Sequence, residues 1–202
     1  MPLGGWAAAA VSHPTVNRVQ TRLLGRRRLE DHLRPVAGRT AEHRTTGVVV
    51  DVGGGTARSR AMWPAGWRYV SVDPDARVTT LEDRDGAVER VVGDAADLPL
   101  PDACASVVLM QCVSHHLDDD TWPAALDEAV RVLADDGHLV FLDGVWSDRR
   151  VVSRWFWRLD AGHHPRSADH LERSIGSRFD ILDVDRFTLV HHSILVTARV
   201  RR

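Results

Sequence analysis

The fold is decided by one stretch of the sequence, VVVDVGGGTARSR, at residues 48–60. Its run of three valines is typical of a strand buried in a parallel sheet that is covered on both faces. The strand ends at an acid, Asp51, and opens into three glycines, which permit positive φ angles and a close approach of a ligand to the backbone. A helix starting near Ala57 would direct its N-terminal amides at that ligand. Together these features predict a nucleotide-type site at the carboxyl edge of a doubly wound sheet.

The spacing of the glycines excludes two common nucleotide sites. A dinucleotide-binding loop needs glycine at its first, third and sixth positions, and counting from Gly53 the sixth position is Arg58. A phosphate-binding P-loop needs a lysine, and the sequence contains none. An acid directly before the loop would repel a pyrophosphate but would suit a cationic ligand.

The pattern acid-x-Gly-x-Gly resembles the first motif of the class I S-adenosylmethionine (SAM)-dependent methyltransferases. The resemblance implies that the glycine loop passes under the amino-acid part of SAM and that Asp51 helps to hold it. One position departs from the family pattern: the last glycine of its loop motif is Ala57 here.

Further segments follow in the order that this family has. A second strand, expected at residues 67–72, ends at Asp73, about 20 residues after the first acid, where a carboxylate can accept hydrogen bonds from both ribose hydroxyls. Residues 89–117 resemble the ubiquinone/menaquinone-biosynthesis branch of small-molecule methyltransferases. In that branch the Asp94-Ala95 pair follows the third strand, and the resemblance implies that the acid bonds the adenine amino group. Residues 126–145 resemble the helix, turn and fifth strand that come next.

Each of these residues also has an ordinary explanation when it is taken alone. A strand-end aspartate often caps a helix, glycines often form a plain turn, and an aspartate before a proline often starts a turn. The order and spacing of the whole set favour the cofactor site. The predicted cofactor-binding residues are Asp51, Gly53, Gly54, Gly55, Thr56, Asp73, Pro74, Asp94, Ala95 and Gln111.

The predicted fold class is α/β, with a doubly wound, seven-stranded, mostly parallel sheet that carries helices on both faces and a C-terminal antiparallel hairpin. Periodicity supports the alternation of strands and helices, and the strand order is implied by the resemblance. At 202 residues we expect a single domain. Its parts would be an N-terminal helical cap (1–46), a SAM-binding core (47–145), and acceptor-facing helices with the closing hairpin (146–202).

The candidate catalytic residues are two histidines that follow the fourth strand. His116 is the first choice and His115 the second, because this loop borders the methyl group and a neutral imidazole can accept a proton. The alternative is that one of the pair only braces the loop. The predicted acceptor-binding residues are His164, Arg166, Trp155 and His191, although the arginine could instead cap a helix and the tryptophan could simply pack in the core. No metal site is expected, because the histidine pairs lack cysteine or carboxylate partners at ligand spacing.

Composition narrows the class of partner and the compartment. The net charge of −2 indicates neither a nucleic acid nor a membrane surface as partner, and no apolar run is long enough to span a bilayer. Cys104 and Cys112 are expected to be free thiols, so we expect a cytoplasmic protein, either monomeric or a homodimer.

The predicted reaction is methyl transfer from SAM to a small organic acceptor, at oxygen or nitrogen rather than carbon, with S-adenosylhomocysteine as product. Two alternatives stay open. One is a methyltransferase-like cyclase or isomerase that binds SAM without transferring its methyl group. The other is a catalytically silent partner subunit, which the alanine in the glycine loop leaves open.

Overall fold

The computed structural model describes residues 26–81, 86–146, 157, 164–189 and 192–201, and within them a seven-stranded sheet carries the fold. The strands are β1 Val48–Val52, β2 Arg68–Asp73, β3 Glu89–Val92, β4 Ala105–Gln111, β5 Leu133–Val145, β6 Phe179–Thr188 and β7 His192–Val200. The helices are α3 Arg26–Ala41, α4 Thr121–Val132 and α6 Ala168–Gly176, and short 3-10 helices are η1 Arg58–Met62, η2 Ala76–Thr80 and η3 Ser114–His116.

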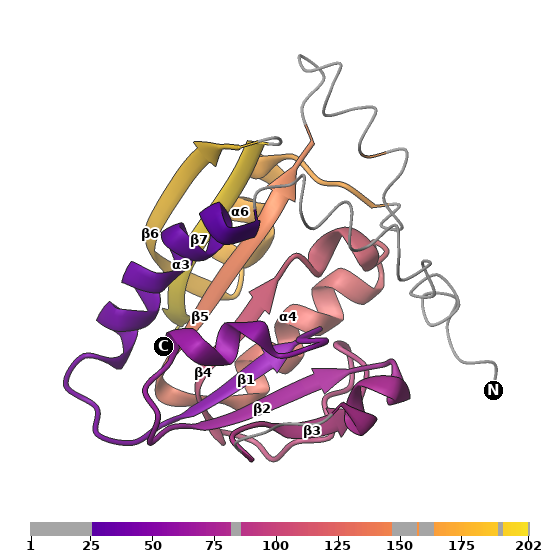
Figure 1. Cartoon of the computed structure of the whole chain (residues 1–202). Helices are drawn as coiled ribbons and strands as arrows, with labels where there is room; N and C mark the ends of the chain where they lie inside the picture. Colours follow the sequence, from indigo (N-terminus) through magenta and orange to yellow (C-terminus); the bar gives the residue numbers. More distant parts are fainter. Residues whose placement is uncertain (1–25, 82–85, 147–156, 158–163, 190–191, 202) are drawn as a thin grey trace.

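The strand order is β3-β2-β1-β4-β5-β7-β6 (Figure 1). The first five strands of this order are parallel, and β7 runs antiparallel to both of its neighbours, β5 and β6. The predicted doubly wound sheet with a closing antiparallel hairpin is therefore confirmed.

Alternation along the strands produces two cores, one on each face of the sheet. On one face Val50, Val108 and Phe141 pack with side chains of α4 and α6. On the other face Val49 and Leu109 pack beneath α3. Because both faces are covered, the central strands read as continuous apolar runs, which is why they are legible in the sequence.

The helices bury side chains at helical spacing. In α4 the buried residues form one face, as in an amphipathic helix: Trp122, Ala125, Leu126, Ala129 and Val132. In α6 the hydroxyl of Ser167 accepts a hydrogen bond from the backbone N–H of His170 at 3.2 Å, so this serine is the N-cap. None of the helices within the described ranges is long and apolar enough to cross a membrane.

The strand order reverses between β1 and β4, and the loops that follow these two strands meet there. The Cβ of an alanine at Gly53 would lie 2.6 Å from the Cγ2 of Val113, so the two loops are in direct contact. In open α/β sheets this switch point is the usual place for a ligand.

Two expectations about the helices need comment. The helix expected to start near Ala57 is wrong: Ala57 has left-handed backbone angles (φ 55°, ψ 35°), and only the five-residue η1 follows it. Pro64 and Gly66 come directly afterwards and disfavour a longer helix. Of the expected N-terminal cap, α3 lies on the sheet, while residues 1–25 are outside the described residues, as is most of the segment 147–163.

Candidate cofactor and acceptor site

The glycine loop folds back against the end of β2. The N–H of Gly53 and, more weakly, that of Gly54 donate to the carbonyl oxygen of Val72, at 2.8 and 3.4 Å. Gly54 has no room for a side chain, because a Cβ there would lie 2.4 Å from the Oγ of Ser71 and 2.5 Å from the Oδ2 of Asp51. The loop backbone therefore lies directly over two polar side chains of the sheet.

Asp51 lies beneath this loop and is 3% exposed. The Tyr69 hydroxyl donates to its Oδ2 at 2.6 Å. Burial raises the pKa of Asp51 to about 7; the tyrosine hydrogen bond opposes the rise, and the nearby Asp73 adds to it. The neighbouring Ser71 Oγ is buried and has no hydrogen-bond partner among the described residues. A cation above the loop would stabilise the ionised form of this carboxyl group.

Asp73, the last residue of β2, uses both carboxyl oxygens to order the backbone around it. Its Oδ2 accepts from the N–H of Gly55 at 3.0 Å and its Oδ1 from the N–H of Asp75 at 2.9 Å. Partial burial raises the pKa of Asp73, while these two backbone hydrogen bonds lower it. The carboxylate lies beside the glycine loop, where the sequence predicts a ribose acceptor.

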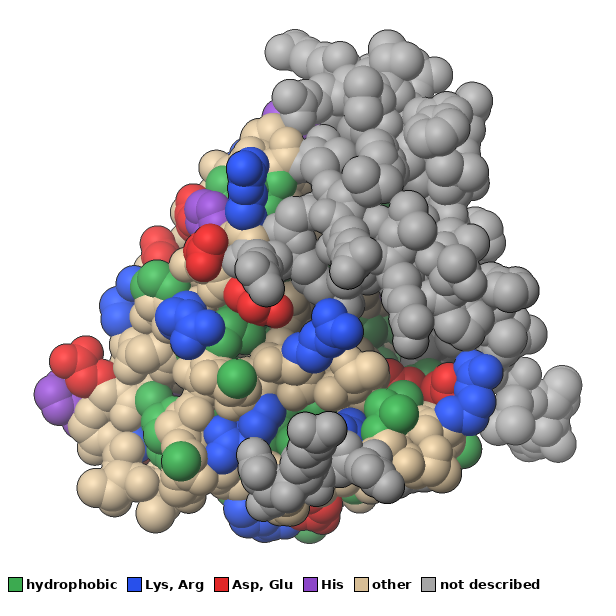
Figure 2. All heavy atoms as spheres, in the orientation of Figure 1, with side chains coloured by type: hydrophobic (Ala, Val, Ile, Leu, Met, Phe, Trp, Pro, Cys, Tyr) green, Lys and Arg blue, Asp and Glu red, His purple; other side chains and the backbone are tan. Residues whose placement is uncertain are grey.

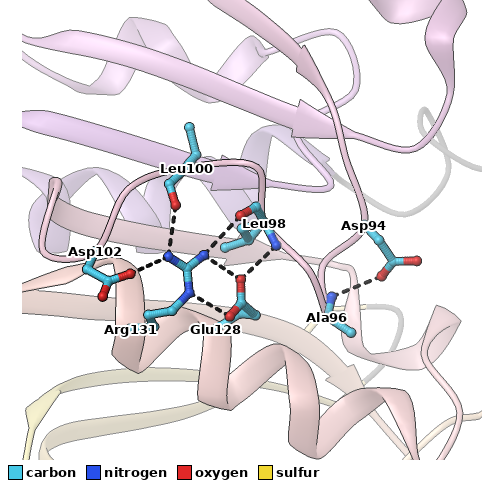
Figure 3. A network of polar contacts seen from close by, with 7 residues as sticks. All are labelled: Asp94, Ala96, Leu98, Leu100, Asp102, Glu128 and Arg131. Carbon is cyan, nitrogen blue, oxygen red and sulfur yellow. Dashed lines mark hydrogen bonds and ion pairs between the residues drawn. The ribbon is translucent and has the colours of Figure 1, made fainter.

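The Asp94-Ala95 pair begins a loop that α4 holds in place (Figure 3). The Asp94 Oδ1 accepts from the N–H of Ala96 at 2.9 Å, and Ala95 is buried. Further along, the Arg131 guanidinium donates to the carbonyl oxygens of Leu98 and Leu100, at 2.9 and 2.8 Å.

Two carboxylates complete this anchor. The Arg131 guanidinium also donates to Asp102 and, through two nitrogens, to Glu128. Glu128 in turn accepts from the N–H of Leu98 at 2.7 Å. Three bonds of this network reach the backbone of Leu98 and Leu100, so side chains of α4 hold the loop that follows Asp94.

Gln111, at the end of β4, accepts a hydrogen bond from Ser59 of η1 through its Oε1, at 2.7 Å. This contact ties the turn after the glycine loop to the strand beyond the switch point. Thr56 is exposed at the tip of the loop and Pro74 is partly exposed after Asp73. The cofactor roles of all three residues stay predictions.

The two candidate catalytic histidines lie in η3, immediately after β4. His115 is 7% exposed, and its Nδ1 lies 2.7 Å from Oδ1 of Asp143, which is 1% exposed. His116 is half-buried, and its ring centroid is 4.2 Å from that of His115. The edge of Trp157 approaches the His115 ring at 5.3 Å. The His115 ring is thus held by a carboxylate and by two neighbouring rings.

Asp143 belongs to β5 and is surrounded by donors. Its Oδ2 accepts from the N–H and the hydroxyl of Ser114, at 2.9 and 2.6 Å, and its Oδ1 accepts from the N–H of Gly144 at 2.7 Å. Burial alone would raise the pKa of Asp143, but the His115 charge and these hydrogen bonds lower it below its ordinary value.

The predicted acceptor-facing segment packs against the same turn. The N–H of His164 donates to the His115 carbonyl oxygen at 3.1 Å. The buried Arg166 guanidinium donates to the carbonyl oxygens of Ser114 and Leu117, at 2.7 and 3.0 Å, and to Asp119 at 2.8 Å. These contacts favour a bracing role for Arg166, and its acceptor role stays a prediction.

Two of the predicted acceptor residues, Trp155 and His191, lie outside the described residues. Within the described part of the chain, no group of three histidine, cysteine, aspartate or glutamate side chains is arranged to hold a metal ion.

Sequence reasoning missed Asp143, although a signal for it exists. In VFLDGV an acid interrupts an apolar strand directly before a glycine, and in VVVDVGG the acid Asp51 stands two residues before one. A carboxylate in an otherwise apolar, buried strand must find partners in the fold, so both positions identify functional candidates.

The donor set fits SAM. A buried carboxyl group lies under a glycine loop, where the cationic amino-acid part of SAM would be held. Asp73, at the next strand end, and the Asp94 loop offer acceptors for the ribose and the adenine. When bound, SAM supplies an electrophilic methyl group on a positively charged sulfur.

Comparisons with known proteins agree with this geometry. Residues 50–141 match the family model described as a methyltransferase domain. No curated protein sequence matches the chain. The PH0226 protein of Pyrococcus horikoshii OT3 has 18% identity and a TM-score of 0.73, over 94% of this chain and 100% of that one.

Two further structures are similar in fold. The Haloferax volcanii methyltransferase solved in complex with the Trm112 activator has 15% identity and a TM-score of 0.68, over 100% of both chains. The Burkholderia thailandensis 1,6-didemethyltoxoflavin-N1-methyltransferase, solved with its substrate and S-adenosylhomocysteine, has 20% identity and a TM-score of 0.67, over 100% of this chain and 93% of that one. Residues 50–141 therefore form a class I methyltransferase domain, and the protein is an enzyme that depends on SAM.

Proposed function

We propose that the protein transfers the methyl group of SAM to oxygen or nitrogen of a small organic acceptor. The observation that carries the proposal is the contact between Gly53 and Val113, which brings the glycine loop against the turn that holds both histidines. A cofactor held on the loop and an acceptor beside η3 would then be neighbours. Placing the two reactants together is the largest contribution an enzyme can make to such a displacement.

The remaining part of the proposal concerns the residues that hold each partner. Asp51 and Asp73 would hold the amino-acid part and the ribose, and the Asp94 loop the adenine. A histidine of η3 would accept the proton of an acceptor that must lose one, which contributes about 10²–10⁴-fold to the rate. Acidic and basic side chains are interspersed over the coloured part of the face drawn in Figure 2, which supports a small acceptor over a nucleic acid.

The pattern of residues 89–117 supports the proposal that the protein belongs to the ubiquinone/menaquinone-type branch. We also propose that it is a cytoplasmic enzyme and that it acts as a monomer or homodimer. The small-molecule substrate of the similar Burkholderia enzyme supports an acceptor of that size. Mass spectrometry of ligands that co-purify with the protein tests the size of the acceptor. The mass of the protein in solution tests the monomer or homodimer. A co-purifying protein activator in stoichiometric amount would contradict the monomer or homodimer.

Binding of the cofactor is tested by calorimetry with SAM, S-adenosylhomocysteine and NAD. Asp73→Ala should weaken SAM binding by about 1–3 kcal/mol, because the ribose hydroxyls lose their acceptor. Asp75→Ala is the matched control, since this carboxylate pairs with Arg77 two residues further on. Equal affinity of the Asp73→Ala variant and the wild type would place the ribose elsewhere.

Transfer itself is tested with methyl-labelled SAM and a panel of phenols, amines and carboxylic acids. Label in the acceptor supports the proposal. A chemically changed acceptor without label would indicate a cyclase or isomerase, and absence of both SAM binding and turnover would indicate a silent partner subunit.

A further inference from the structure

His115 and Asp143 form a buried pair with more hydrogen bonds than are needed to brace the loop. The carboxylate accepts four hydrogen bonds or charge contacts: the Nδ1 of His115 and the N–H of Gly144 on Oδ1, and two groups of Ser114 on Oδ2. A carboxylate with lowered pKa is an acceptor only. The proton in the 2.7 Å contact therefore belongs to Nδ1 of the histidine.

A fixed proton on Nδ1 determines what the other side of the ring can do. The form of His115 that can accept a proton is the neutral imidazole, which has one N–H, so with Nδ1 protonated the lone pair is on Nε2. The ring cannot turn over without losing the contact with Asp143, and it also meets the rings of His116 and Trp157. An acid that holds a histidine in one tautomer is the orienting device of the serine hydrolase triad, on an unrelated fold.

We propose, resting on the methyl transfer proposed above, that Asp143 is the positioning residue that makes Nε2 of His115 the proton acceptor of this enzyme. The turn that holds His115 begins at Val113, which contacts Gly53 of the cofactor loop. The assignment selects the second of the two histidines expected from the sequence, and it adds a residue from a different strand.

The proton balance of the step is complete with the groups named. The acceptor's X–H proton moves to Nε2 of His115, and the electron pair of X forms the bond to the methyl carbon. The pair of the carbon–sulfur bond stays on sulfur, which becomes a neutral thioether. His115 becomes an imidazolium ion, and the negative charge of Asp143 stabilises it across the 2.7 Å contact.

The tautomer is measured directly on the whole wild-type protein labelled with ¹⁵N in its histidine rings. We expect the His115 resonances, assigned by their loss in His115→Gln, to show the proton on Nδ1 at pH 8. In Asp143→Asn this signature should weaken or be lost. A wild-type His115 protonated on Nε2 would overturn the proposal, and this measurement does not depend on whether a variant folds.

The kinetic test compares turnover with binding. Asp143→Asn should lower kcat for an acceptor by about 10²–10⁴-fold and leave the KM for SAM within a fewfold of the wild type. The rise of kcat with pH should also change, which loss of a structural brace would not cause. Ser114→Ala is the matched control, because it removes one donor to the same carboxylate and leaves the histidine contact, so it should keep the Nδ1 tautomer.

The outcomes separate this proposal from the one on which it rests. A wild-type protein that labels no acceptor would overturn the methyl transfer and with it the role of His115 as base. Normal turnover in Asp143→Asn, or an equal loss in Ser114→Ala, would overturn the positioning role alone.

Discussion

Two aspartates, Asp51 on β1 and Asp143 on β5, are almost completely buried near the carboxyl ends of parallel strands, but their environments are opposite. Asp51 receives one side-chain hydrogen bond among the described residues, from Tyr69, and burial raises its pKa to about 7. Asp143 receives four contacts, and its pKa is lowered. By strand alternation they also face different sides of the sheet.

Because both groups are buried, the comparison indicates that hydrogen-bond donors, rather than burial alone, decide whether a buried carboxyl group is ionised. Asp143 is satisfied by the protein itself, so it can hold another side chain in place. Asp51 receives fewer hydrogen bonds, so its ionised form would be stabilised most by the positive charge of a bound ligand. In this molecule Asp51, which receives few hydrogen bonds, is in the predicted cofactor site. Asp143, which receives four, supports the predicted chemistry.

The largest expected effect comes from making Asp143 resemble Asp51. His115→Leu should lower the free energy of unfolding by about 3–5 kcal/mol at pH 7, because it leaves a buried carboxylate without the histidine that it pairs with. In the wild type the lowered pKa of Asp143 adds stability above the unfolded value of 3.8, and this stability is lost as pH falls. In the variant its pKa should be raised, so that stability would fall as pH increases.

Urea denaturation of the cofactor-free protein between pH 4 and 8 measures both effects. His116→Leu serves as the control, because it removes the neighbouring ring and keeps the contact between His115 and Asp143. Equal losses of unfolding free energy in the two variants would contradict the importance of the contact between His115 and Asp143.

Removal of the carboxyl group of Asp51 should stabilise the protein. Asp51→Asn should raise the free energy of unfolding of the cofactor-free form at pH 8 by up to about 4 kcal/mol, which is the cost of ionising this buried group. Because the folded pKa of about 7 lies above the unfolded 3.8, the wild type is most stable below pH 3.8 with respect to this group and loses that stability as pH rises through 7. The variant should lack this slope.

The same variant should bind SAM at least about tenfold more weakly, because the negative charge under the loop is gone. Denaturation curves and calorimetry on one preparation test the two opposite changes together. Asp75→Asn, at the surface, should produce neither. A destabilised Asp51→Asn protein would show that the donors around Asp51 are better than its single tyrosine contact indicates.

The smallest expected effect concerns the backbone of the glycine loop. Ala57→Gly should raise stability by ~0.5 kcal/mol, since relief of the left-handed conformation is worth about 1–2 kcal/mol and loss of the buried methyl group costs about 0.8 kcal/mol. The melting temperature should rise by about 1–2 °C. Gly54→Ala should act in the opposite direction, because its Cβ would meet Ser71 and Asp51. A lower melting temperature for Ala57→Gly would mean that the methyl packing outweighs the strain.

The sequence predicts what depends on local pattern. Apolar runs mark the buried strands, and acids at their ends mark the edge where the site lies, as at Asp73 and Asp94. The short η1 was not predicted, because the left-handed turn at Ala57 is decided by how the loop packs on β2 and β4. The pairing of His115 with Asp143 crosses 28 positions of the chain, and that of Arg166 with Ser114 crosses 52, so no local pattern could reveal either.

The place of β7 in the sheet has a consequence for how the chain is made. β7 hydrogen-bonds to both β5 and β6, and both of these precede it in the sequence. On a ribosome, the first five strands can pair while β6 has no neighbour to join. The gap between β5 and β6 closes only when β7 emerges, so one edge of β5 and one edge of β6 stay unpaired until then. Synthesis of β7 is thus the step that completes the seven-stranded sheet.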